Sequence, residues 1–214
     1  MNNLRLLGLT AGVGSLILSG SATADFQGIS WTSTSSAYGD TYLIYVDVEA
    51  GDQLNAVYGD DVNALSIDSN GGFYQNTWGG AVSTAINAGL IDVFPSLAYD
   101  SWVTIGLSDQ VGNAMLNIGI DFTEFALGGA ITTDNGSWFA TPADLQVYEI
   151  DGRVLIGQFT VDGDIEGTIN IQGKNADLTN WQERGISFSS AVIPAPGAIA
   201  LLGLAGLASR RRRS

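Results

Sequence analysis

The strongest constraint in the sequence is an apolar run near its carboxyl end, residues 191–209, which contains no charged side chain. A helix built from such a run is apolar around its whole circumference, so it must be buried in protein or in lipid. The part after Pro196 is about 20 Å long as a helix, against a bilayer core of about 30 Å. Arginines follow, and basic residues stay on the cytoplasmic side. We expect a transmembrane helix at about 197–209; a buried C-terminal helix is the alternative.

Three features follow one another in this tail. Pro194, Ala195 and Pro196 precede the apolar segment, and a basic tail of Arg210, Arg211, Arg212 and Arg213 follows it. This order resembles the PEP-CTERM sorting signal, in which a Pro-Glu-Pro motif precedes a short apolar segment and an Arg-rich end; Ala195 stands in place of the family's Glu. The resemblance covers residues 194–214. It implies that an exosortase-like membrane transpeptidase processes the chain and sorts it to the cell envelope or extracellular matrix.

Residues 1–24 have the composition of a secretory signal peptide. A basic residue, Arg5, precedes an apolar stretch at 6–18, and small residues at Ala22 and Ala24 suit a signal peptidase, with cleavage before Asp25. A permanent N-terminal membrane anchor is the alternative, which the short apolar stretch disfavours. We therefore expect export through the general secretion machinery.

The body between the two signals, residues 25–193, has the usual length of one domain. All 22 acidic residues lie in it, against only Arg153, Lys174 and Arg184, so its net charge is −19. Phosphate binding needs clustered basic residues, which argues against a nucleic-acid partner. The chain has no histidine and no cysteine, which excludes disulfides, thiol nucleophiles and the usual catalytic triads. We expect the protein not to be an enzyme.

The body has the pattern of an all-β protein. Residues 41–48 alternate, with Tyr42, Ile44, Val46 and Val48 on one face, and residues 165–171 alternate in the same way. Asp151-Gly152 predicts a type I′ turn between strands at 145–150 and 153–161. Helical spacing predicts one short helix at 82–90. Further extended segments are expected at 65–67, 73–78, 102–107, 115–122, 125–131 and 186–188. We predict a single β-sandwich, either jelly-roll or immunoglobulin-like.

One acidic motif could hold a metal. Asp162, Asp164 and Glu166 occupy the first, third and fifth positions of a sequence that begins like an EF-hand loop, with Gly167 at the sixth. The twelfth position is Gly173 rather than the bidentate Glu, and the flanks read as strands. A plain turn between strands is therefore the first interpretation and a calcium site of another kind the second. We expect the protein to have no cofactor, with calcium as the alternative.

The five tryptophans, all in the body, provide the other candidate site. Trp78 and Trp138 lie beside Gly or Ser turns, so we expect them to be more exposed than the others. Exposed tryptophans can stack on sugar rings; the alternative is that tryptophan fills the core.

These observations give one preferred function and two alternatives. The preferred one is an exported envelope or matrix protein, anchored in the membrane transiently or permanently, with a structural body. The second is an extracellular module that binds carbohydrate or calcium within extracellular polysaccharide. The third is a glycosidase, which would need two facing carboxylates in a cleft.

Overall fold

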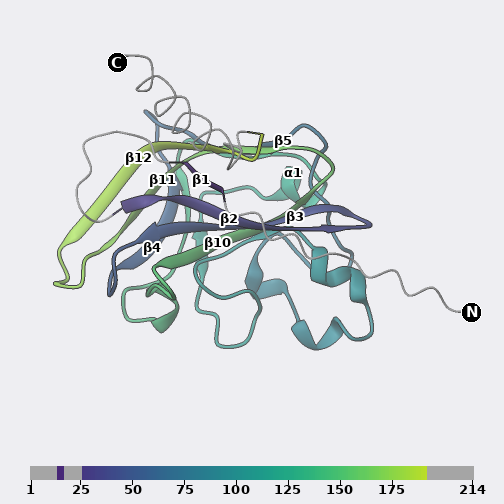
Figure 1. Cartoon of the computed structure of the whole chain (residues 1–214), viewed down its shortest axis with the longest axis horizontal. Coiled ribbons are helices and arrows are strands. Elements are labelled where there is room, and N and C mark those ends of the chain that lie inside the picture. Colours follow the sequence, from purple (N-terminus) through teal and green to yellow (C-terminus); the bar gives the residue numbers. More distant parts are fainter. Residues whose placement is uncertain (1–13, 17–25, 192–214) are drawn as a thin grey trace, which may run out of the picture.

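A computed structural model of the chain describes residues 14–16 and 26–191, and shows a mainly β protein with two sheets (Figure 1). The strands are β1 (Gly14–Leu16), β2 (Phe26–Ser36), β3 (Gly39–Val48), β4 (Gln53–Gly59), β5 (Leu65–Ser69), β6 (Trp102–Val103), β7 (Leu116–Ile118), β8 (Ile131–Thr133), β9 (Gly136–Phe139), β10 (Arg153–Val161), β11 (Ile165–Lys174) and β12 (Asn180–Ser189). The helical elements are α1 (Thr123–Ala126) and the 3-10 turns η1 (Ser83–Ala85), η2 (Ala88–Leu90), η3 (Pro95–Tyr99) and η4 (Leu145–Val147).

The two sheets are antiparallel. The five-stranded sheet has the order β1-β2-β3-β10-β6, and the seven-stranded sheet has the order β7-β9-β4-β11-β5-β8, with β12 paired to β11. A short loop of three residues, 162–164, carries the chain from β10 in one sheet to β11 in the other. The expectation of an all-β, two-sheet body is confirmed. The choice between a jelly-roll and an immunoglobulin-like sandwich stays a prediction.

Side chains from both sheets meet in one core. Ile44 and Val46 of β3 are buried in the same cluster as Val57 of β4 and Ile169 and Ile171 of β11. Burying one such side chain fully contributes roughly 1.5–3 kcal/mol, so this cluster is the main source of stability. The alternation predicted for residues 41–48 is confirmed, because Ile44, Val46 and Val48 are buried in this core and Tyr42 packs against it. In residues 165–171 the isoleucines face the core as predicted, but Asn170 between two of them is buried as well.

The Asp151-Gly152 turn is also confirmed. Both residues have positive φ, 56° and 78°, as a type I′ turn requires. Ile150 and Arg153 exchange backbone hydrogen bonds across it, at 3.0 and 3.3 Å. The strand expected before the turn is wrong, because residues 145–147 form η4 and only single bridges involve Tyr148 and Ile150.

The short helix was predicted at the wrong place. Residues 82–90 contain η1 and η2, while α1 overlaps the start of the segment 125–131 that was expected to be extended. Two side chains in 82–90 make hydrogen bonds that do not belong to a helical ladder. The buried hydroxyl of Ser83 lies 2.7 Å from that of Thr104, and the Asn87 side chain accepts the Gly89 N–H locally. The Asn87 bond is local and competes with a helical hydrogen-bond ladder, whereas the Ser83 bond is a tertiary contact.

Most of the two predicted signals lies outside the described residues. This applies to Ala22, Ala24 and Asp25, and to the whole sorting signal at 194–214. Within the predicted signal peptide, β1 pairs with Ile29, Ser30 and Trp31 of β2. Among the residues that the structure describes, no helix has the length and apolar character to cross a membrane.

The buried side chain of Asn170 provides a test of the fold. Its Nδ2 donates to the Asn63 carbonyl (2.7 Å) and its Oδ1 accepts the Gly185 N–H (2.8 Å), which joins the β4–β5 loop and a bulge of β12 to β11. Asn170→Leu leaves both backbone groups without that partner. We expect it to lower the free energy of unfolding by about 2–3 kcal/mol, measured by urea unfolding.

Thr168→Val on the same strand is the control. The Thr168 hydroxyl lies near that of Ser187 in an exposed pair, so the loss should stay within about 0.5 kcal/mol. Equal effects of the two substitutions would contradict the role given to Asn170.

Candidate functional site: an aromatic patch and a polar hollow

The three acidic residues of the calcium motif do not converge. Asp162 and Asp164 lie on the exposed β10–β11 loop, where the Asp164 N–H donates to Asn70 Oδ1 (3.1 Å). Glu166 lies on β11, opposite Asp68 and Ser189. Among residues 14–16 and 26–191, no group of three acidic, His or Cys side chains is placed to hold a metal ion. The turn interpretation is confirmed, and a calcium site stays a prediction.

The expectation that Trp138 is exposed is wrong. Trp138 lies on β9, which is flanked by β4 and β7, and its ring points into the core with no exposed surface. Its indole Nε1 donates to the Thr104 carbonyl at 2.9 Å. A ring that is enclosed in this way cannot stack on a ligand.

Trp78, the other predicted tryptophan, is 52% exposed. Its ring stacks on Phe94, with centroids 4.5 Å apart and an interplanar angle of 16°. The other three tryptophans, Trp31, Trp102 and Trp181, are buried. Trp78 is therefore the tryptophan of the described chain that presents a large aromatic surface to solvent.

Three tyrosines extend this surface. The Tyr38 ring lies 4.5 Å from that of Tyr74 and 5.5 Å from that of Tyr99. Asn76 joins the two groups of rings, because its Nδ2 donates to the Tyr74 hydroxyl (3.0 Å) and its Oδ1 accepts the Trp78 N–H (3.0 Å). We call Tyr38, Tyr74, Trp78, Phe94 and Tyr99 the aromatic patch. The sequence pattern did not indicate its tyrosines, which come together only through segments far apart in the chain.

The Asp100 carboxylate holds the loop that carries Trp78. This residue is fully buried; its Oδ1 accepts the Asn76 N–H at 2.6 Å and its Oδ2 accepts the Gly80 N–H at 2.9 Å. Gly79 packs so closely that a Cβ atom there would lie 1.7 Å from Oδ2. Both carboxylate oxygens accept hydrogen bonds from backbone N–H groups, so Asp100 positions the loop and does not face a ligand.

The patch is thus preformed. Trp78 lies between two backbone anchors on Asp100, and Phe94 covers one face of its ring, which leaves the other side for a ligand. Flat aromatic surface beside amide and hydroxyl groups is suited to molecules that have both apolar faces and polar edges, such as sugars.

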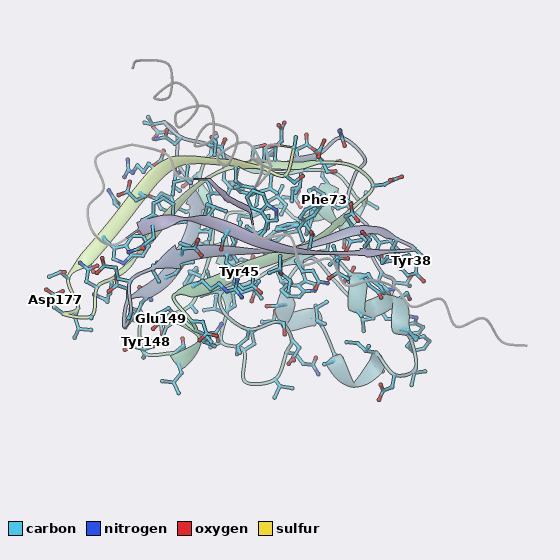
Figure 2. All side chains as sticks on the ribbon, in the orientation of Figure 1. Tyr38, Tyr45, Phe73, Tyr148, Glu149 and Asp177 are labelled. Carbon is cyan, nitrogen blue, oxygen red and sulfur yellow. The ribbon has the colours of Figure 1, made fainter. Side chains whose placement is uncertain are left out.

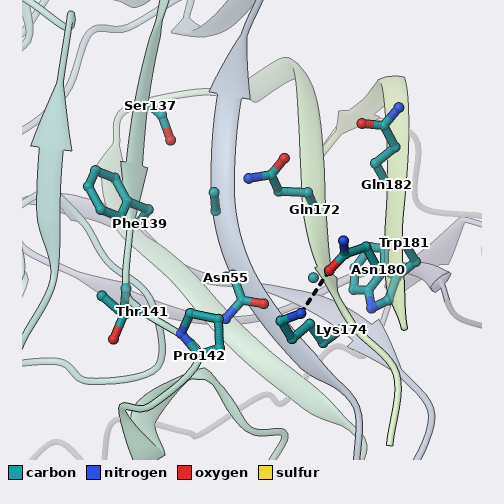
Figure 3. A pocket seen from close by; sticks show the side chains of 13 residues that line it. Asn55, Ser137, Phe139, Thr141, Pro142, Gln172, Lys174, Asn180, Trp181 and Gln182 are labelled. Atoms are coloured by element: carbon teal, nitrogen blue, oxygen red, sulfur yellow. Dashed lines mark hydrogen bonds between the residues drawn. The ribbon is translucent and has the colours of Figure 1, made fainter. Parts of the chain in front are cut away.

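A second site, which the sequence did not indicate, is a hollow of about 750 Å³ on the seven-stranded sheet (Figure 3). We call it the polar hollow. It spans β9, β4, β11 and β12, and Figure 3 shows Phe139, Thr141 and Pro142 along one side and Trp181 and Gln182 on the other. Its residues are Asn55, Ala56, Ser137, Phe139, Ala140, Thr141, Pro142, Gln172, Gly173, Lys174, Asn180, Trp181 and Gln182.

The two sites lie toward opposite ends of the body. In Figure 2, Tyr38 of the patch and Asp177, in the loop between β11 and β12 beside the hollow, are at opposite ends of the molecule. A smaller hollow of about 410 Å³, lined in part by Asp68, Glu166 and Thr168, lies over β5, β11 and β12. Comparisons with known protein families, curated proteins and solved structures found no match to this chain.

Asp100 gives the site a testable pH dependence. Burial raises the pKa of Asp100 to about 6, although backbone N–H groups of Asn76, Gly80 and Ser101 act to lower it. Because the folded carboxyl binds a proton more readily than the unfolded one, the folded state is favoured at low pH. Its stability should therefore fall as pH rises from about 4 to about 6, by roughly 1–3 kcal/mol in total.

Urea unfolding at pH 4.5, 5.5, 6.5 and 7.5 checks this, with Asp100→Asn as the comparison. The variant keeps the other carboxylates and their mutual repulsion, so the difference between the two pH profiles isolates Asp100. We expect the variant's profile to be flatter above pH 4.5. Parallel profiles would contradict a raised pKa at this position.

Proposed function

We propose that this is an exported protein of the cell envelope or extracellular matrix that binds extracellular polysaccharide through the aromatic patch. The observation that carries the proposal is the exposed, preoriented Trp78 ring stacked on Phe94 beside three tyrosines. Ring stacking of this kind recognises the apolar faces of sugars without requiring charge.

The location follows from the two signals expected in the sequence. A signal peptide at 1–24 and a PEP-CTERM-like signal at 194–214 would export the chain, and an exosortase-like enzyme would then process it at the membrane. The acidic body supports this proposal, since a net charge of −19 keeps an exported domain soluble.

A purely structural body is the competing proposal. It needs no exposed aromatic surface, whereas Trp78 retains 52% of its surface in contact with solvent. Glycoside hydrolysis is less well supported, because the carboxylate nearest to the patch in the chain, Asp100, is enclosed and bound by the backbone. Binding without catalysis is the function that this arrangement supports best.

Trp78→Ala tests the patch. We expect it to weaken binding to neutral glucans about tenfold or more, because the stacking surface is lost. The measurement is isothermal titration with cellohexaose, laminarihexaose and maltohexaose. Trp78→Phe should retain part of the affinity.

Tyr148→Ala is the matched control, since Tyr148 is an exposed aromatic residue (38%) outside the patch. It should bind these probes as the unmodified protein does. Equal affinity of the Trp78→Ala variant and the control, or no binding by the unmodified protein, would refute the proposed role of the patch.

Sorting is tested separately, by intact-mass spectrometry of the protein released from producing cells. We expect a species that begins at Asp25 and ends near Pro196. A released protein that still carries Arg210 to Arg213 would contradict processing at Pro194-Ala195-Pro196.

A further inference from the structure

The polar hollow differs in charge from the rest of the body. Among the 22 acidic residues of the sequence, none lines it, and its one charged residue is Lys174, the only lysine in the chain. Amide side chains of Asn55, Gln172, Asn180 and Gln182 line it as well. This hollow is therefore rich in hydrogen-bond donors in a protein that is otherwise strongly acidic.

The other two basic residues of the body are engaged elsewhere. The Arg153 guanidinium lies over the Tyr45 ring, 4.1 Å from its centroid, and Arg184 lies 3.4 Å from Asp60. Lys174 Nζ donates instead to Asn180 Oδ1 (2.8 Å) and to the Leu178 carbonyl (3.4 Å) (Figure 3). These two neutral acceptors fix the ammonium group beside the hollow and account for two of its three N–H groups.

A buried donor lies in the same wall. Trp181, which is only 6% exposed, lines the hollow, and its indole Nε1 has no hydrogen-bond partner within the described structure. The ring lies over Gly173 of β11, where a Cβ atom would approach its Cζ2 to 2.5 Å. Buried donors are normally paired, so this one calls for an acceptor that the described chain does not supply.

We propose that the polar hollow binds a hexuronic acid residue of a polysaccharide, with Lys174 holding its carboxylate. The hydroxyls of the sugar suit the amides, and the Trp181 ring lies in the wall beside which the sugar would bind. A charge-assisted bond to an ammonium group is about twice as strong as a neutral one, which favours an acidic sugar over a neutral sugar of the same shape. The lining itself carries no carboxylate that would repel such a ligand at direct contact. This inference rests on the proposed function in taking polysaccharide as the ligand, but it uses a different surface.

The experiment uses three probes of similar size: trigalacturonic acid, its fully methyl-esterified form and neutral maltotriose. Methyl esterification removes the charge while it keeps the shape. Affinity is measured by isothermal titration. The site is located by NMR, from the shift of the Trp181 indole N–H resonance on binding. This resonance is assigned as the one that is missing from the spectrum of the Trp181→Phe variant. We expect the acid to bind at least tenfold more tightly than its ester and to shift that resonance.

Lys174→Gln removes the charge and Lys174→Arg retains it. Lys174→Gln should lower affinity for trigalacturonic acid about tenfold, leave affinity for the ester unchanged, and keep the Trp181 resonance at its unliganded position; Lys174→Arg should restore much of the acid binding. The inference is overturned if the unmodified protein does not bind the acid, if ester and acid bind equally, or if Lys174→Gln has no effect.

Trp78→Ala should leave acid binding unchanged. Loss of glucan binding in that variant and loss of acid binding in Lys174→Gln therefore report on the two proposals independently.

Discussion

Backbone pairing along β11 is the interaction on which most of the structure depends. This strand pairs with β12 along one edge, and with β5 and then β4 along the other. Its inward side chains, such as Ile169 and Ile171, enter the core, while Gln172 and Lys174 reach the polar hollow. A one-residue shift in register would exchange these two sets of side chains. Asn170 opposes such a shift, because its side chain bonds both to the β4–β5 loop and to β12.

The aromatic patch depends on a different kind of constraint. In the loop that carries Trp78, a buried carboxylate supplies the acceptors for the N–H groups of Asn76 and Gly80. Burying Asp100 is unfavourable for its charged form, so the ordered loop that carries Trp78 comes at the expense of stability at neutral pH. Local features that lower the stability of the folded state are typical of functional loops. In the sheets, by contrast, backbone N–H and C=O groups pair with one another between strands.

The features that could be predicted from the sequence are those that local residue patterns determine. The alternation of β3 and β11 and the positive-φ pair Asp151-Gly152 depend on neighbouring residues, and all three were found. Strand β4 was missed, because both of its faces are largely buried and its residues do not alternate. Trp138 was misplaced for a related reason: the Gly and Ser beside it mark a turn, but its burial is decided by β4 and β7 on either side. No local signal indicates that Tyr38, Tyr74 and Tyr99 meet.

Charge separates the two proposed sites from the remaining surface. Acidic side chains dominate the body, yet the ring contacts of the patch are all made by uncharged residues and the hollow is lined without any acid. Repulsion from the remaining surface would keep an acidic polymer away except where Lys174 and the amides meet it. A neutral segment, in contrast, meets no such barrier at the patch. Because the sites lie toward opposite ends of the two-sheet body (Figure 2), one molecule that uses both would connect two segments of polysaccharide instead of binding one segment twice.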